Sequence, residues 1–203
     1  MSERLIRRRD ASRGLYVDLE GRAVPGEPPV LLGVLYEDDE ANGGLILRQL
    51  VIDPAFRDLA RDETPNIEPC SIEESLEWLL DLSSGEQRPV ISWSRYDRNL
   101  IKELTSDRAF RYRNAIATAK RWARSSEEVE RPAVNELRAY EKLIGYERPP
   151  ELHRVGESLA YIRRLRSVTD GARQRWTTIV AHNEHDLRSM REVVLHVRGI
   201  AGQ

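Results

Sequence analysis

Apolar and polar residues alternate with a period of two over residues 15 to 20, the pattern of a β-strand whose two faces differ. Two apolar runs follow, over Pro29 to Tyr36 and Leu45 to Val51. The acidic, glycine-containing segment between these runs is typical of a turn. The opening of the chain therefore predicts a three-stranded meander.

Strand and helix patterns alternate after the meander. Ser71 and Glu74 have the spacing of a capping box, and the apolar residues that follow recur at helical spacing until Gly85. The run from Pro89 to Trp93 predicts a fourth strand, and residues 96 to 104 predict the helix after it.

Beyond residue 109 the pattern predicts helices, over 114–124, 137–144 and 155–165, and no further strand. A charged loop is expected over 125–132. A terminal helix carries one apolar face, made by Leu187, Met190, Val193, Val194 and Val197. Together the elements predict one α/β domain over residues 1–203, a mixed sheet with an antiparallel meander and parallel strands, flanked by helices.

Composition narrows the class of protein. Charged residues make up 33% of the chain and apolar residues 40%, without a run long enough to cross a bilayer, so we expect a soluble protein with no membrane partner. The arginine-rich Met1 to Arg13 lacks the apolar stretch of a secretory signal, which favours the cytoplasm. The single cysteine, Cys70, excludes an internal disulfide and a multi-thiolate zinc site.

Basic residues are unevenly distributed although the net charge is only -2. They gather within residues 4–13, 108–124 and 163–175. Such clusters permit contact with a phosphate backbone, and ordinary solvated surface is the alternative.

Asp18 and Glu20 are two residues apart on the first strand, so both carboxylates project to the same side. Two acids this close repel one another unless a cation or strong hydrogen-bond donors keep them ionised. A divalent ion such as Mg²⁺ resolves the conflict because it prefers carboxylate oxygen. The alternative is a pair of exposed acids at a strand end.

Two further acids lie at suggestive places. Asp97 follows the fourth strand, where α/β sheets place functional groups, although with Ser94 it also matches a capping box. Asp186 shares a helical stripe with His182, a candidate partner for its charge. His182 and His185 resemble a zinc pair, but the chain offers no well-spaced third ligand, and His185 is expected at the surface.

An Asp-Leu-Glu on the first strand, an Asp after the fourth, and the segment His182-Asn183-Glu184-His185-Asp186 at the start of the last helix occur in the order expected of DEDD exonucleases. With these motifs, the chain from Leu15 to Val197 resembles the YprB-type ribonuclease H-like domain of that superfamily, which is also found attached to predicted RecB-like nucleases. The phrase from Leu143 to Arg148, together with Gly156 and Trp176, carries the same resemblance.

Two positions depart from the family pattern. The last motif usually begins with tyrosine, where this chain has His182, so the general base resembles that of the histidine-type exonucleases. The second motif often has His-Asn before its aspartate, where this chain has Ser92 and Trp93. The acids at all four positions are present.

The resemblance implies a 3′–5′ exonuclease that hydrolyses single-stranded nucleic acid with two Mg²⁺ or Mn²⁺ ions, roughly 3.5 to 4 Å apart in such sites. It implies that Asp18 bridges the ions and that Glu20 and Asp186 hold the one bearing the attacking water. Asp97 then supports the second ion, and His182 deprotonates the water.

Three alternatives stay open at this point. In the first, the domain is a non-catalytic nucleic-acid or protein-binding module, accessory to a larger nuclease or helicase. In the second, it is a metal-dependent endonuclease. In the third, the acids are unrelated surface residues. The pattern also favours a monomer.

Overall fold

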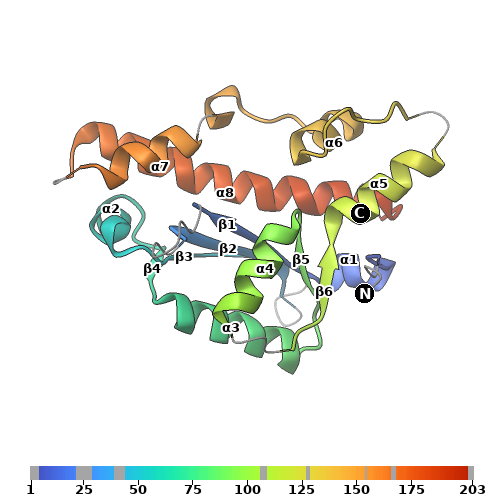
Figure 1. The fold of residues 1–203 in the computed structure, drawn as a ribbon, viewed down its shortest axis with the longest axis horizontal. Coiled ribbons are helices and arrows are strands. Elements are labelled where there is room, and N and C mark those ends of the chain that lie inside the picture. Colours follow the sequence, from blue (N-terminus) through green and yellow to red (C-terminus); the bar gives the residue numbers. More distant parts are fainter. Residues whose placement is uncertain are drawn as a thin grey trace.

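A computed structural model describes residues 5–21, 29–38, 44–105, 109–126, 129–153, 155–165 and 168–200. Its centre is a six-stranded sheet in the order β4-β3-β2-β1-β5-β6 (Figure 1). The strands are β1 Leu15–Glu20, β2 Leu31–Glu37, β3 Leu45–Val51, β4 Glu68–Pro69, β5 Val90–Ser92 and β6 Tyr112–Asn114.

The sheet is mixed, as predicted. The pairs β1 with β2 and β2 with β3 are antiparallel, which confirms the meander. β5 runs parallel to β1, β6 parallel to β5, and β4 parallel to β3. The parallel neighbours β1 and β5 therefore end at the same edge of the sheet, where the predicted acids Asp18, Glu20 and Asp97 lie.

Helices cover both faces of the sheet (Figure 1). The longest, α8, crosses one face, and α3 and α4 lie against the other. The helices are α1 Arg8–Arg13, α2 Arg57–Glu63, α3 Ile72–Gly85, α4 Arg95–Leu104, α5 Ala115–Ser125, α6 Leu137–Ile144, α7 Val155–Arg163 and α8 Asp170–Val197, with 3-10 turns η1 Pro54–Phe56 and η2 Pro150–His153.

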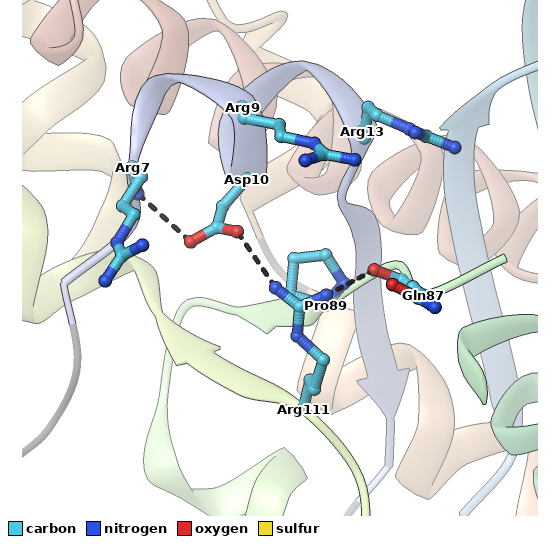
Figure 2. Close-up of a pocket in the computed structure, with 7 residues that line it drawn as sticks. All are labelled: Arg7, Arg9, Asp10, Arg13, Gln87, Pro89 and Arg111. Atoms are coloured by element: carbon cyan, nitrogen blue, oxygen red, sulfur yellow. Dashed lines mark hydrogen bonds and ion pairs between the residues drawn. The ribbon is translucent and has the colours of Figure 1, made fainter.

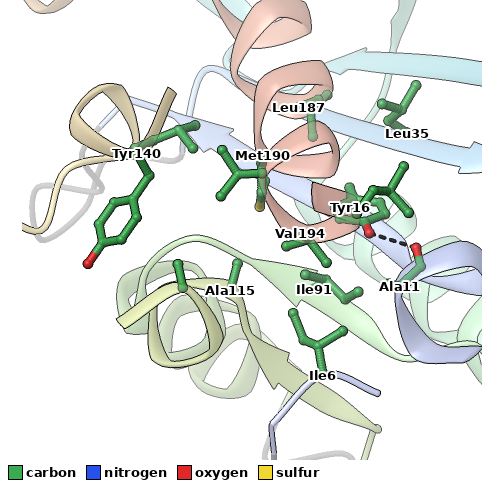
Figure 3. Close-up of a cluster of buried hydrophobic side chains, with 14 of the residues drawn as sticks. Ile6, Ala11, Tyr16, Leu35, Ile91, Ala115, Tyr140, Leu187, Met190 and Val194 are labelled. Atoms are coloured by element: carbon green, nitrogen blue, oxygen red, sulfur yellow. Dashed lines mark hydrogen bonds between the residues drawn. The ribbon is translucent and has the colours of Figure 1, made fainter. Parts of the chain in front are cut away.

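The first strand is buried on both faces. Tyr16 points toward α8 and packs in a cluster with Leu187 and Met190 (Figure 3). Leu15 and Val17 point to the opposite side and pack with residues of α3 and α4. Burial of both faces fixes the register of β1, because a slip of one residue would move its carboxylates to the other face.

Several elements differ from the sequence prediction. β6 was not predicted, because its three residues are too few to display a period. The short helices α1 and α2 were also missed. α8 has 28 residues and begins at Asp170, so the His182 to Asp186 motif lies in the middle of a helix and not at its start.

Part of the basic and loop predictions lies outside the described residues, namely Arg4, Arg108, Arg166 and the middle of the charged loop at 127–128. Across the described part of the chain, no helix combines the length and apolar character needed to span a membrane.

Candidate active site

The end of β1 brings Asp18 and Glu20 beneath the middle of α8. The Asn183 side chain donates from Nδ2 to Asp18 Oδ2 over 2.9 Å. His182, the preceding residue of α8, places Nε2 at 3.7 Å from Glu20 Oε1. The two carboxylates thus project to the same face of the sheet, as the alternation predicted.

A network of amides fixes the position of Asp18. Gln49 on β3 donates from Nε2 to Asn183 Oδ1 over 2.9 Å and to the Val180 carbonyl over 3.0 Å. Because the Asn183 oxygen faces Gln49, its NH₂ group faces Asp18, and Asn183 is fully buried. Neither amide was assigned this role from the sequence.

Close approach of α8 to the sheet depends on Gly33. A Cβ built at Gly33 would lie 2.0 Å from Asn183 Oδ1 and 2.6 Å from Leu187 Cδ1. Glycine inside a strand typically marks such an approach of another element, and this signal was available in the apolar run of β2.

Three potential ligand atoms converge at the centre of the site. One ligand atom from each of Glu20, His182 and Asp186 lies within 4.8 Å of the other two. His182 Nε2 is 3.6 Å from Asp186 Oδ2, one helical turn along α8. This is the only group of three or more potential metal ligands among the residues that the structure describes.

Asp97 joins the cluster from the first turn of α4, and its side chain is buried. Ser94 Oγ donates to Asp97 Oδ2 over 3.1 Å, so the capping-box pattern is also present. The negative charge of Asp97 nevertheless raises the pKa of both Asp18 and Glu20. All five residues selected from the sequence therefore meet in one site.

Asp18, Glu20 and Asp97 resist ionisation because their pKa values are raised. Burial, then the charges of Glu20, Asp186 and Asp97, raise the pKa of Asp18 well above its usual range. Burial and the charge of Asp186 raise the pKa of Glu20 to about 8, and burial raises the pKa of Asp97 to about 6. Burial lowers the pKa of His182, which is neutral at neutral pH.

These shifts predict a pH-dependent stability. Carboxyl groups with raised pKa values stay protonated in the folded protein at a pH where the unfolded chain has released the same protons. The contribution of these groups to the free energy of unfolding is therefore fully present below about pH 4 and is lost as the pH rises to about 8. Thermal denaturation in EDTA should show the melting temperature decreasing across this range. Adding Mn²⁺ should recover it at pH 8, and an identical profile with and without Mn²⁺ would contradict binding at this cluster.

Arg148 is a further residue of the candidate site that was given no role from the sequence. Its Nη2 lies 2.5 Å from Asp186 Oδ1 and 2.5 Å from Glu141 Oε1, and Nη1 lies 3.3 Å from His182 Nδ1. Arg148 is thus an ionic partner of Asp186 that the sequence did not predict, and His182, the predicted partner, lies 3.6 Å from the other carboxylate oxygen. In the sequence, the segment from Leu143 to Arg148 contributes to the resemblance only and indicates no role for Arg148. The structure adds that Glu141 on α6 is buried and therefore needs a cation partner.

His185 also differs from its prediction as a surface residue. Its side chain is half-buried, its ring lies 5.1 Å from that of Tyr146, and its buried Nε2 has no hydrogen-bond partner among the described residues. It contributes no atom to the group formed by Glu20, His182 and Asp186.

Oxygen donors and one imidazole fit a divalent cation such as Mg²⁺ or Mn²⁺. Arg148 pairs with Oδ1 of Asp186, whereas Oδ2 faces His182 Nε2 at 3.6 Å and is the oxygen that can serve as a ligand. Repulsion among Asp18, Glu20 and Asp97 also favours a bound positive charge.

Comparison with protein-family models finds no match to the chain, and comparison with curated proteins finds none.

Proposed function

We propose that this chain is a ribonuclease H-like, metal-dependent 3′–5′ exonuclease that hydrolyses phosphodiester bonds of single-stranded nucleic acid. The observation that carries the proposal is the meeting of Asp18, Glu20, Asp97 and Asp186 with a neutral His182. The sheet supports it, because an antiparallel β3-β2-β1 meander continues into parallel β5 and β6. The acids lie where β1 and β5 end.

Asp18, Glu20, Asp97 and Asp186 are the residues that would hold two Mg²⁺ or Mn²⁺ ions. When bound, such ions polarise the scissile phosphate and neutralise charge that develops on its oxygens. The chain itself contributes the positions of the carboxylates: Asn183 and Gln49 orient Asp18, and Arg148 holds Asp186.

His182 is the proposed general base. Burial lowers its pKa, so at neutral pH the imidazole is uncharged. Because Arg148 is a donor, its contact with Nδ1 puts the single hydrogen of the neutral ring on Nε2, which faces Glu20 and Asp186. Transfer of a proton from water to Nε2 therefore requires the other neutral tautomer, with its hydrogen on Nδ1 and the Arg148 contact broken.

His182→Ala should slow hydrolysis about 10²-fold, the lower end of the contribution of a general base, while Mn²⁺ binding persists through the carboxylates. Single-turnover rates and isothermal titration with Mn²⁺ measure the two effects separately. His196→Ala on the same helix is the matched control, because His196 packs against Trp122 away from the acids. A normal turnover rate in His182→Ala would remove this residue from the mechanism.

The test of the function itself is degradation of 3′- and 5′-labelled single-stranded DNA and RNA with Mg²⁺ or Mn²⁺. A ladder that shortens from the 3′ end supports the proposal. Cleavage of circular single strands would indicate the endonuclease instead.

The pairing of Arg148 with Asp186 favours a second candidate, the non-catalytic module, because a guanidinium there competes with a cation. Nucleic-acid binding without metal uptake or hydrolysis would support that candidate.

A further inference from the structure

Arginine side chains gather in a pocket at the edge of the sheet opposite the carboxylates. The pocket has a volume of about 220 Å³ and is lined by Arg7, Arg9, Asp10, Arg13, Gln87 and Arg111, among others (Figure 2). It lies beside the start of β1, where the Leu15 amide donates to the Pro89 carbonyl.

The one carboxylate of the pocket is already neutralised. Asp10 Oδ2 accepts from Arg113 Nε over 2.9 Å and from the Arg7 amide over 3.2 Å, and both Asp10 and Arg113 are buried. Asp10 therefore anchors α1 to β6. Its single negative charge is shared between Arg113 and Arg111, so it does not also balance the charges of Arg7 and Arg9. The pocket keeps a positive charge although the chain has a net charge of -2.

The guanidinium of Arg111 is held in place and is half-exposed. Its Nη1 donates to the Gln87 carbonyl over 2.6 Å and its Nη2 to Asp10 Oδ1 over 3.4 Å, and its side chain is 50% exposed. Arg9 is exposed, and its side chain has no ion pair or hydrogen bond with the residues that the structure describes. Figure 2 shows these two side chains on opposite sides of the pocket. The fixed guanidinium of Arg111 and the exposed guanidinium of Arg9 offer donors that match the oxygens of a phosphate.

We infer that this pocket is a phosphate-binding site that holds the backbone of a single-stranded nucleic acid away from the site of hydrolysis. The choice of nucleic acid rests on the proposed function, whereas the phosphate chemistry rests on the arginines alone. β1 separates the pocket from the acids by roughly 17 Å, at about 3.3 Å per residue. A stacked strand that reaches both has about five nucleotide steps at 3.4 Å each.

The test is a binding measurement in EDTA, so it does not depend on hydrolysis. Fluorescence anisotropy of labelled single-stranded DNA of about 20 nucleotides should show the Arg7→Ala/Arg9→Ala protein binding about tenfold more weakly. The slope of log affinity against log salt should become shallower by about 1.4, because two phosphate groups are no longer neutralised by the protein. The Asp10 to Arg113 and Arg111 pairs remain, so the melting temperature should not change.

The matched control is Arg57→Ala/Arg61→Ala, which removes the same charge from α2 at a distance from the pocket; Arg61 there pairs with Asp58. Arg7→Lys/Arg9→Lys keeps the charge and should keep the salt slope, which separates loss of charge from damage to α1. Thymidine monophosphate is the second probe.

Loss of mononucleotide affinity with unchanged DNA affinity in Arg7→Ala/Arg9→Ala would assign the site to a free nucleotide phosphate. Loss of DNA affinity would assign it to the backbone. Affinities of both probes equal to those of the wild type, in a folded double variant, would overturn the inference. Because the binding assay contains EDTA and measures no hydrolysis, that result would not count against the proposed nuclease activity. Conversely, a wild-type protein without nuclease activity, together with weaker DNA binding by Arg7→Ala/Arg9→Ala, would contradict the proposed function and support the phosphate-binding site.

Discussion

Asp18→Asn is expected to reduce phosphodiester hydrolysis to background, a loss of at least about 10³-fold by comparison with the removal of single electrostatic groups from other active sites. Asp18 lies at the centre of the cluster, where the charges of Glu20, Asp186 and Asp97 all act on its carboxyl group. The asparagine has the same shape and one charge fewer, so it removes a proposed cation ligand without opening a cavity.

The fold of Asp18→Asn should be intact. Burial and the neighbouring charges disfavour the ionised Asp18 carboxylate, so the neutral amide should leave the melting temperature unchanged or raise it at pH 8. The amide oxygen can still accept the hydrogen bond from Asn183 Nδ2. A lower rate in this variant therefore reports chemistry and not unfolding.

The measurement is the rate of shortening of 3′-labelled single strands with saturating Mn²⁺, alongside circular dichroism and thermal denaturation. Asp81→Asn is the matched control, because Asp81 is exposed on α3, which lies against the opposite face of the sheet from α8. Control and wild type should be equally fast. Retained activity in Asp18→Asn would refute the assignment of this cluster as the catalytic centre.

The sequence predicted the cluster through regular periods and short spacings. A strand has a period of two, so Asp18 and Glu20 had to share a face once β1 was identified. The stripe from His182 to Asp186 follows from the helical period in the same way. The prediction that Asp97 lies near Asp18 and Glu20 required only that the parallel strands β1 and β5 end at the same edge of the sheet. Each inference needed one element or one pair of neighbours.

The missed residues act across long separations. Arg148 reaches Asp186 from the segment between α6 and α7, and Gln49 reaches Asn183 from β3. No period or motif connects such positions, because the contact exists only after α8 packs against the sheet. β6 was missed for a related reason: three residues acquire strand geometry by pairing with β5, not from their own pattern.

The arrangement of α8 against the sheet leads to the second large effect, that of Gly33→Ala. Asn183 Oδ1 lies 2.0 Å and Leu187 Cδ1 2.6 Å from the position of the added Cβ. Neither atom can retreat easily, because Asn183 is held by Gln49 and Asp18 and Leu187 is fully buried. The methyl group must therefore push α8 away from β2.

We expect Gly33→Ala to lower the free energy of unfolding by about 3 kcal/mol, the upper part of the range for overpacking. For a chain of 203 residues this corresponds to a decrease in melting temperature of roughly 6 to 12 °C. At temperatures below the melting transition, where the variant is still folded, its rate of hydrolysis should also be lower, because a displaced Asn183 no longer orients Asp18. Differential scanning calorimetry and the exonuclease assay at low temperature measure the two effects.

Gly85→Ala is the matched control, because a Cβ there meets nothing within 4 Å and Gly85 is the last residue of α3. Alanine is favoured over glycine in a helix, so the control should gain up to about 0.5 kcal/mol. A Gly33→Ala protein as stable as this control would mean that α8 does not lie as close to β2 as described. The contact of Asn183 with Asp18, on which the geometry of the proposed catalytic cluster depends, would then have to be abandoned as well.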